Sequence, residues 1–174
     1  MKKRVLKASL IDTPLGTMLA VTDDEGLYLL EFVDRRGIEK EIARFSKKTN
    51  LSVVQCTSAP AKKIEAELKE YFSGKIQSFK TPLFLIGTPF QQSVWEELQK
   101  IPSGKTRSYA EIAKAIGKPT AFRAVALANG ANRIAIVIPC HRVINSSGAL
   151  GGYGGGIEKK EWSIEHEKST YRKE

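Results

Sequence analysis

Cysteine and histidine are scarce in this sequence, which limits the metal sites and disulfides that it can form. The 174 residues include two cysteines, Cys56 and Cys140, and two histidines. There is no Cys-x-x-Cys pair and no zinc-finger spacing, so we expect no metal site and no cofactor. Without a secretion signal, reduced thiols are favoured over a disulfide between the two distant cysteines, although the sequence leaves that disulfide open.

Long apolar segments are absent as well. No stretch approaches the roughly 20 apolar residues that a membrane-spanning helix needs. The basic residues 1–7 are not followed by the apolar segment of a secretory signal. We therefore expect a cytoplasmic protein with no membrane partner.

The chain has more basic than acidic residues. Lysine and arginine number 28 against 19 aspartates and glutamates, which gives a formal net charge of +9 at pH 7. This balance favours polyanionic partners, nucleic acid before anionic membrane. The length suits one ordinary domain or two small ones, and either can bury a core without disulfides.

The first half of the chain has the pattern of a supporting α/β domain. Alternating apolar residues predict an antiparallel meander of three strands, at residues 6–12, 17–22 and 26–33. The acidic turn at 23–25 is typical of a solvent-exposed hairpin rather than a metal site. We find no catalytic cluster in this half.

Helices are also predicted in the first half. The spacing of Ile38, Ile42 and Phe45 predicts an amphipathic helix, and residues 51–56 fit a short strand. A second helix begins after Ser58 and stops at Gly74. We place the boundary in the polar segment that follows, so the predicted domains are 1–82 and 83–174.

The second half has the pattern of a helix-turn-helix. Capping boxes at 88–91 and 108–111 predict two helix starts, and a break at 117–120 separates the second of these helices from another at 121–129. This last helix carries one charge, Arg123, among small residues. A helix that recognises base edges in the major groove usually carries several Arg, Asn or Gln side chains. The small residues of this helix instead favour close approach to the narrower minor groove. A buried core helix is the alternative explanation of the alanines.

A reactive thiol is predicted at Cys140. The apolar run 134–138 is typical of a buried strand or other buried segment, and Pro139 ends any regular ladder. Next to Cys140 stand His141 and Arg142, a base and a positive charge that favour a thiolate. In an extended segment these neighbours would point oppositely, so we expect a water between the thiol and the imidazole. A buried structural cysteine is the alternative.

A glycine-rich loop follows the thiol. Residues 148–156 include enough glycine for backbone to lie close to a ligand. A flexible linker is the alternative, but Tyr153 and the nearby helix predicted at 157–168 argue against it. Residues 169–174 are predicted to be a frayed polar tail.

The sequence Pro139-Cys140-His141-Arg142-Val143, preceded by Asn132 and followed by the glycine-rich loop, resembles the active-site signature of the O6-alkylguanine-DNA alkyltransferases, or methylated-DNA–protein-cysteine methyltransferases. The similarity covers residues 87–167 in the family's order. It implies an α+β fold, with an N-terminal antiparallel three-stranded sheet with helices. The C-terminal domain would be mainly helical, with a helix-turn-helix and the active-site cysteine.

The resemblance implies direct, stoichiometric and irreversible transfer of an alkyl group from the O6 oxygen of guanine in double-stranded DNA to Cys140. O4-alkylthymine is a second candidate substrate. His141 would take the proton of Cys140, and Glu167 would hold the imidazole. Tyr109 would donate to the departing guanine, and Asn132 would tie the segment of Cys140 to the second helix. The protein would act once per molecule, as a monomer associated with the nucleoid and without an obligate protein partner.

The same resemblance implies that the second helix enters the minor groove while the damaged nucleotide rotates out of the duplex. Arg123 would fill the vacated space. The implied DNA-binding residues are Thr120, Arg123, Ala124, Ala126 and Leu127. The implied substrate pocket consists of Asn129, Val143, Tyr153, Gly154 and Gly155.

Some features depart from the family's pattern. Ala126 and Leu127 stand where many relatives have glycine or a smaller residue, and Arg133 replaces a usual proline; these changes bear on DNA affinity. The cysteines and histidines of the zinc site that some members carry are missing. Three other functions fit part of the pattern: a lesion-marking protein without catalysis, a helix-turn-helix transcription regulator, and a cysteine hydrolase that uses Cys140 and His141.

Overall fold

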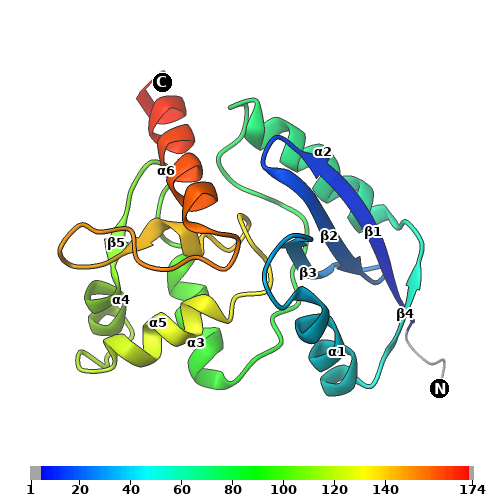
Figure 1. Cartoon of the computed structure of the whole chain (residues 1–174), viewed down its shortest axis with the longest axis horizontal. Helices are drawn as coiled ribbons and strands as arrows, with labels where there is room; N and C mark the ends of the chain where they lie inside the picture. The colour runs from blue at the N-terminus through cyan, green and yellow to red at the C-terminus, as the bar shows by residue number, and fades with distance from the viewer. Residues whose placement is uncertain (1–4, 173–174) are drawn as a thin grey trace. The chain divides into compact units, whose positions relative to one another are not determined.

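A computed structural model of the chain describes residues 5–172, and the predicted basic start and the end of the predicted tail lie partly outside them. The chain forms two compact units, Met1–Phe84 and Leu85–Glu174 (Figure 1). In the part of the chain that the structure describes, no helix has both the length and the hydropathy needed to cross a bilayer.

The first unit is built on a sheet with strand order β3-β2-β1-β4. The strands β1 (Val5–Thr13), β2 (Gly16–Thr22) and β3 (Leu27–Phe32) pair antiparallel, so the predicted three-stranded meander is confirmed. The short strand β4 (Ser52–Gln55) adds to the edge of the sheet, parallel to β1. The acidic turn is structural: Asp23 accepts hydrogen bonds from the backbone N–H groups of Glu25 and Gly26.

Two helices complete this unit, α1 (Ile38–Thr49) and α2 (Ala59–Phe72). The hydroxyl of Ser58 accepts from the backbone N–H of Ala61 at 3.0 Å and so caps α2, as its sequence pattern predicts. The helix packs on β1 and β2 and buries Ile64 and Leu68.

The chain remains attached to the first unit as far as Phe84. The N–H of Leu27 donates to the carbonyl of Pro82, and the N–H of Phe84 donates to the carbonyl of Leu27, both at 2.9 Å. The carboxylate of Glu67 accepts from the backbone of the same segment, at Thr81. These bonds explain why the first unit includes residues beyond the polar linker.

The second unit is mainly helical. Its elements are α3 (Pro89–Leu98), β5 (Arg107–Ser108), α4 (Tyr109–Ala115), α5 (Phe122–Gly130), the 3₁₀ turn η1 (Cys140–Arg142), β6 (Val143–Ile144) and α6 (Ile157–Arg172). Both predicted capping boxes are formed, at the starts of α3 and α4. Helices α3, α4 and α5 pack together, and α4 and α5 are the two helices of the predicted helix-turn-helix. The ribbon of α6 is red in Figure 1.

The apolar run 134–138 takes the second of its two predicted forms, a buried segment that is not a strand. Residues 135–138 form turns because the side chain of Asn132 occupies backbone groups that a ladder would use. Its amide donates to the carbonyls of Ile134 and Ile138, and its oxygen accepts from the N–H of Ile134. The expected frayed tail is helical through Arg172, because no glycine or proline interrupts α6.

Gly87, just before α3, has no room for a side chain, and this predicts an effect of substitution on stability. A Cβ atom at Gly87 would lie 2.5 Å from Cη2 of Trp95, whose indole N–H donates to the carbonyl of Ala128 at 2.8 Å. We expect Gly87→Ala to lower the free energy of unfolding by about 1–3 kcal/mol through overpacking. Gly130→Ala is the control, because a Cβ at that position meets nothing within 4 Å. Chemical denaturation checks this, and equal effects of the two changes would contradict it.

Candidate active site

Cys140 is the first residue of the turn η1 and is 7% exposed. Its N–H donates to the carbonyl of Ile138 at 2.8 Å, and its carbonyl accepts from the amide of Asn129 at 3.3 Å. The expectation that Cys140 and His141 lie in an extended segment is therefore wrong. The 3₁₀ turn forms because Pro139 supplies no N–H for a ladder, while its carbonyl accepts from Arg142.

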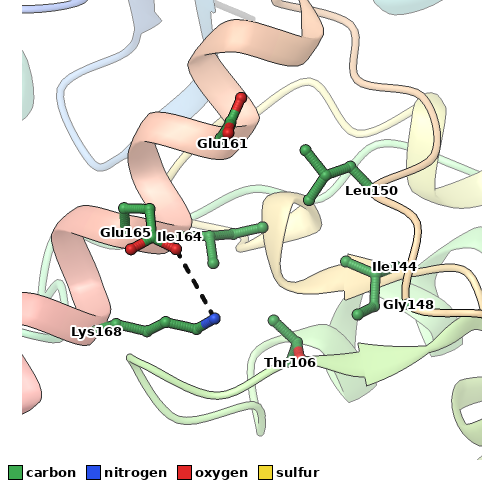
Figure 2. Close-up of a pocket in the computed structure, with 8 residues that line it drawn as sticks. All are labelled: Thr106, Ile144, Gly148, Leu150, Glu161, Ile164, Glu165 and Lys168. Atoms are coloured by element: carbon green, nitrogen blue, oxygen red, sulfur yellow. Dashed lines mark ion pairs between the residues drawn. The ribbon is translucent and has the colours of Figure 1, made fainter.

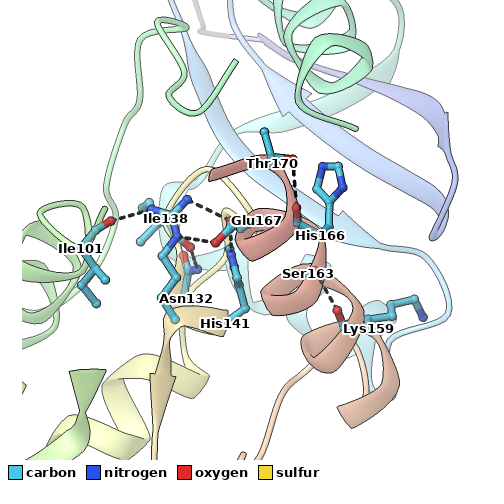
Figure 3. A network of polar contacts seen from close by, with 10 residues as sticks. Ile101, Asn132, Ile138, His141, Lys159, Ser163, His166, Glu167 and Thr170 are labelled. Atoms are coloured by element: carbon cyan, nitrogen blue, oxygen red, sulfur yellow. Dashed lines mark hydrogen bonds and ion pairs between the residues drawn. The ribbon is translucent and has the colours of Figure 1, made fainter. Parts of the chain in front are cut away.

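A buried carboxylate on α6 holds the two residues that follow the cysteine. The Nε2 atom of His141 lies 2.6 Å from one oxygen of Glu167, and Arg142 donates to both oxygens at 2.9 Å (Figure 3). A further N–H of Arg142 donates to the carbonyl of Ile101 at 2.6 Å. His141 is completely buried, and Glu167 is 2% exposed. The contacts join turn η1 to helix α6 and, through Ile101, to the segment that follows α3.

The charge state of Glu167 follows from these contacts. Burial by itself would raise the pKa of this carboxyl group, but the charge of His141 and the hydrogen bonds from His141 and Arg142 outweigh it. The pKa is therefore well below its ordinary value, and Glu167 is an anion at neutral pH. With Nε2 directed at this anion, the other ring nitrogen of His141, Nδ1, has no hydrogen-bond partner among the described residues.

Tyr109 is a predicted site residue from a different segment of the chain than the thiol. It is the first residue of α4 and is half-buried, positioned by the capping box of Ser108. Burial raises the pKa of Tyr109, and negative charge on Cys140 raises it further. The phenol therefore keeps its proton at neutral pH and is able to donate a hydrogen bond.

Two asparagines connect α5 to the segment that carries the thiol. Asn129, in the last turn of α5, donates to the carbonyl of Cys140. Asn132, just beyond the helix, donates to the carbonyl of Ile138 at 2.9 Å. Both side chains are buried. The backbone on either side of Pro139 is thus attached to the end of α5.

The residues predicted to bind DNA lie on or near the outer side of α5. The helix buries Val125, Ala128 and Asn129. Arg123, Ala124 and Leu127 are exposed on the helix, Thr120 is exposed just before it, and Ala126 is half-buried. The leucine is 78% exposed, so the alternative of a wholly buried helix is wrong.

The predicted pocket residues differ from one another in exposure and in the segments that they contact. The N–H of Val143 donates to the carbonyl of Cys140, and Asn129 donates to the same atom. Tyr153 is half-buried and Gly154 is exposed. Gly155 lies near α6, where its carbonyl accepts from Lys159 at 3.1 Å.

A separate hollow lies between β6 and α6 (Figure 2). Its lining includes none of the predicted catalytic, DNA-binding or pocket residues. Lys168 and Glu165 form an ion pair of 3.9 Å at its rim. The lining residues are Thr106, Ile144, Gly148, Leu150, Glu161, Ile164, Glu165 and Lys168.

Both cysteines are free thiols, Cys56 exposed and Cys140 buried. Within residues 5–172, no three Cys, His, Asp or Glu side chains gather as a set of metal ligands.

Sequence reasoning missed one buried residue near the thiol and underestimated another. Lys160 is completely buried, and Arg142, considered only as a nearby charge, is 6% exposed and holds Glu167. The missed signal is the helical spacing of Lys160, Ser163, Ile164 and Glu167, which together form the buried stripe of α6. Polar residues on a buried stripe need partners, and so they mark a candidate site.

The second unit is similar to a known protein family. The sequence model of the family described as "6-O-methylguanine DNA methyltransferase, DNA binding domain" matches residues 89–169. This range holds the thiol, the helix-turn-helix and Glu167, and it defines the class of the second unit.

Relatives match nearly the whole chain. A methylated-DNA–protein-cysteine methyltransferase of Methanosarcina barkeri is 42% identical over 164 residues, 94% of this chain and 98% of the relative. The crystal structure of Mycobacterium tuberculosis OGT in complex with DNA is 41% identical, with a TM-score of 0.81 and 94% of each chain covered. The O6-methylguanine-DNA methyltransferase of Pyrococcus kodakaraensis has a TM-score of 0.68 at 27% identity, covering 94% of this chain and 99% of that one. This chain belongs to the family of methylated-DNA–protein-cysteine methyltransferases.

The arginine that holds Glu167 gives a prediction. We expect Arg142→Met to lower the free energy of unfolding by roughly 3–5 kcal/mol, because it leaves a buried carboxylate with one partner fewer and the carbonyl of Ile101 unpaired. Arg44→Met removes an exposed ion pair with Glu41 and serves as the control, with an expected change below about 1 kcal/mol. Urea denaturation of both variants measures the difference. A loss below about 1 kcal/mol for Arg142→Met would show that the buried contacts contribute little.

Proposed function

We propose that this protein repairs double-stranded DNA by moving an alkyl group from the O6 oxygen of guanine to the sulfur of Cys140, once per molecule. The observation that carries the proposal is that Cys140 is followed directly in the chain by an imidazole that a buried carboxylate holds at 2.6 Å. The pKa of Tyr109, from a distant segment, is raised by negative charge on Cys140. Membership of the family supports the same reaction. The new C–S bond forms as the C–O6 bond breaks, and the proton of the thiol is balanced by the proton that guanine gains.

His141 is the proposed base. Its Nε2 contacts Glu167, so Nδ1 is the atom that takes the proton of Cys140, through a water. The anionic carboxylate stabilises the imidazolium that forms, as in other sites with a nucleophile, a base and an orienting acid. A buried cation–anion contact of this kind also keeps the imidazole in one orientation.

Tyr109 is the proposed donor to the leaving group. Guanine leaves as an anion unless it gains a proton, and the raised pKa of Tyr109 keeps a hydroxyl proton available beside the thiolate. The thioether that results does not hydrolyse, so the thiol is not regenerated. The reaction therefore stops after one turnover.

Helix α5 is the proposed DNA-binding element. A stacked guanine cannot bring its O6 substituent to a buried thiol, so the nucleotide must rotate out of the duplex. Arg123 is exposed on α5 and is available to fill the space that the nucleotide leaves. The M. tuberculosis relative was crystallised with DNA, which supports duplex DNA as the partner. Asn129 and Asn132 would link docking of this helix to the position of Cys140.

The site of alkylation gives a direct test. We expect incubation with a duplex containing O6-methylguanine to add one methylene unit to the mass of the protein, on Cys140 only, and to stop at one equivalent. Cys56→Ser is the control, because this exposed cysteine lies in the first unit, outside the predicted site, and the variant should react like the unchanged protein. Peptide mass spectrometry locates the group. Alkylation of Cys56 or repeated turnover would refute the proposal.

The role of Arg123 predicts a difference between two substrates. We expect Arg123→Ala to slow alkyl transfer from duplex DNA about 10-fold or more, because extrusion of a base costs a few kcal/mol that the arginine partly recovers. Transfer from free O6-benzylguanine should not change, since no base has to leave a stack. Arg44→Ala, an exposed arginine in the first unit, controls for loss of charge. Equal slowing with both substrates would exclude this role.

A further inference from the structure

Arg133 follows Asn132 directly and stands where the family usually has proline. Its charge by itself predicts an effect on DNA affinity, but the structure gives the side chain a partner inside the protein. A guanidinium N–H of Arg133 donates to the carbonyl of Ile86 at 3.0 Å, and the side chain is half-buried. The arginine therefore joins the end of α5 to the first residues of the second unit.

Ile86 belongs to a short stretch, residues 85–87, that is itself held in place. The amide of Gln92, in α3, donates to the carbonyl of Leu85 and to that of Gly87, each at 3.2 Å. With the arginine on the carbonyl between them, three consecutive carbonyls accept hydrogen bonds from side chains. The stretch is thus a fixed anchor for the arginine and not a loose loop end.

The segment that begins after Arg133 has a strained backbone. Ile136, between Arg133 and Cys140, has a φ of +71°, which is a rare conformation for a β-branched residue. The N–H of Val137 donates to the carbonyl of Ala135 at 2.8 Å, which closes a γ-turn of the rare, strained form around Ile136. Such a conformation persists only where the surrounding structure holds it.

Two neighbouring side chains hold this segment from opposite directions. Asn132 bonds the carbonyls of Ile134 and Ile138, as Figure 3 shows for the latter, and Arg133 attaches the start of the segment to the anchor stretch. Cys140 comes directly after, and its N–H donates to the carbonyl of Ile138. The position of the sulfur therefore depends on how firmly the segment is held at its start.

We infer that Arg133 is a positioning residue for alkyl transfer. Its bond to Ile86 fixes the start of residues 134–138 and so keeps the sulfur of Cys140 in line with the alkyl carbon. The inference rests on the proposed function. Arg133 acts through the backbone and contacts neither the guanine nor a phosphate of the duplex, and these two modes of action predict different behaviour.

The test measures three properties of Arg133→Met in a Cys56→Ser background: alkyl transfer from free O6-benzylguanine, labelling by iodoacetamide, and affinity for duplex DNA. We expect the maximal rate of benzyl transfer to fall about 10-fold or more at an unchanged half-saturating concentration, because in-line attack is sensitive to small misplacements. The rate with iodoacetamide should stay within about 3-fold, since the ionisation of the thiol is unchanged. Intact-protein mass spectrometry gives both rates.

The DNA affinity separates positioning from phosphate binding. Arg44→Met removes the same charge from an exposed arginine of the first unit, and it should leave both reaction rates unchanged. We expect Arg133→Met to bind duplex DNA within about 2-fold of this control, with the same salt dependence. Fluorescence anisotropy at several salt concentrations measures the affinity.

A conservative variant protects the test against misfolding. Arg133→Lys keeps a donor for the carbonyl of Ile86, so it should recover part of the rate that Arg133→Met loses. If the methionine variant does not fold, benzyl transfer by Arg133→Lys must fall below that of the unchanged protein while iodoacetamide labelling is retained.

A double-variant cycle identifies the route of the effect. Gln92→Met removes the other two bonds that hold residues 85–87, so its effect on benzyl transfer and that of Arg133→Met should combine less than additively. Additive effects, equal losses in both reactions, or unchanged benzyl transfer would each overturn the inference. Unchanged benzyl transfer with weaker, less salt-dependent DNA binding would make Arg133 a phosphate-binding residue. An unchanged protein that reacts with neither O6-benzylguanine nor methylated DNA would overturn the proposed function as well.

Discussion

The arrangement of the candidate site depends on the hydrogen bonds that the buried carboxylate of Glu167 accepts. This carboxylate accepts from His141 and Arg142, and it joins helix α6 to the turn that begins with Cys140. A buried carboxylate is costly unless cations and donors surround it, and here the two partners are consecutive residues of one turn. The geometry of that turn is therefore fixed by the same contacts that orient the imidazole. Removal of either partner would disturb both.

A second constraint links Cys140 to the surface proposed to meet DNA. Asn129 and Asn132 hold the carbonyls of Cys140 and Ile138 from the end of α5, and the outer face of the same helix exposes Arg123. The apolar run before Pro139 is consequently a series of turns rather than a strand. Its backbone groups are used by side chains of the helix end, so displacement of α5 would move the thiol.

Local patterns predicted much of the fold. The capping boxes at Thr88 and Ser108, the cap at Ser58 and the alternating strands of the meander depend on neighbouring residues, and all are formed. The α+β class is confirmed. The apolar run that begins at Ile134 is a buried segment and not a strand, the other form that its pattern allowed, because a side chain competes for its backbone groups, which periodicity cannot represent. Helical spacing places Lys160 on the buried stripe of α6, but it does not show that the partners of this lysine are carbonyls of a loop.

In the candidate site, too, local sequence patterns identify some residues, while others become visible only through long-range contacts. The sequence marks Cys140 and His141 by their position after an apolar run, but Tyr109 and Glu167 come from distant segments and were chosen by resemblance to a family. The structure places Glu167 2.6 Å from His141 and brings Tyr109 close enough for the charge of Cys140 to affect its pKa. Their chemical roles stay predictions. Arg142 and Lys160 emerge only from burial and long-range contacts.

The most direct test of the account is the position of the proton on the imidazole of His141 in the unreacted protein. Long-range ¹H–¹⁵N spectra distinguish the two ring nitrogens, and a His166→Gln variant assigns the signals because the chain has only two histidines. The account predicts a proton on Nε2, facing Glu167, in every state of the ring, which leaves Nδ1 to receive the thiol proton. A neutral ring with its proton on Nδ1 and a bare Nε2 would contradict it.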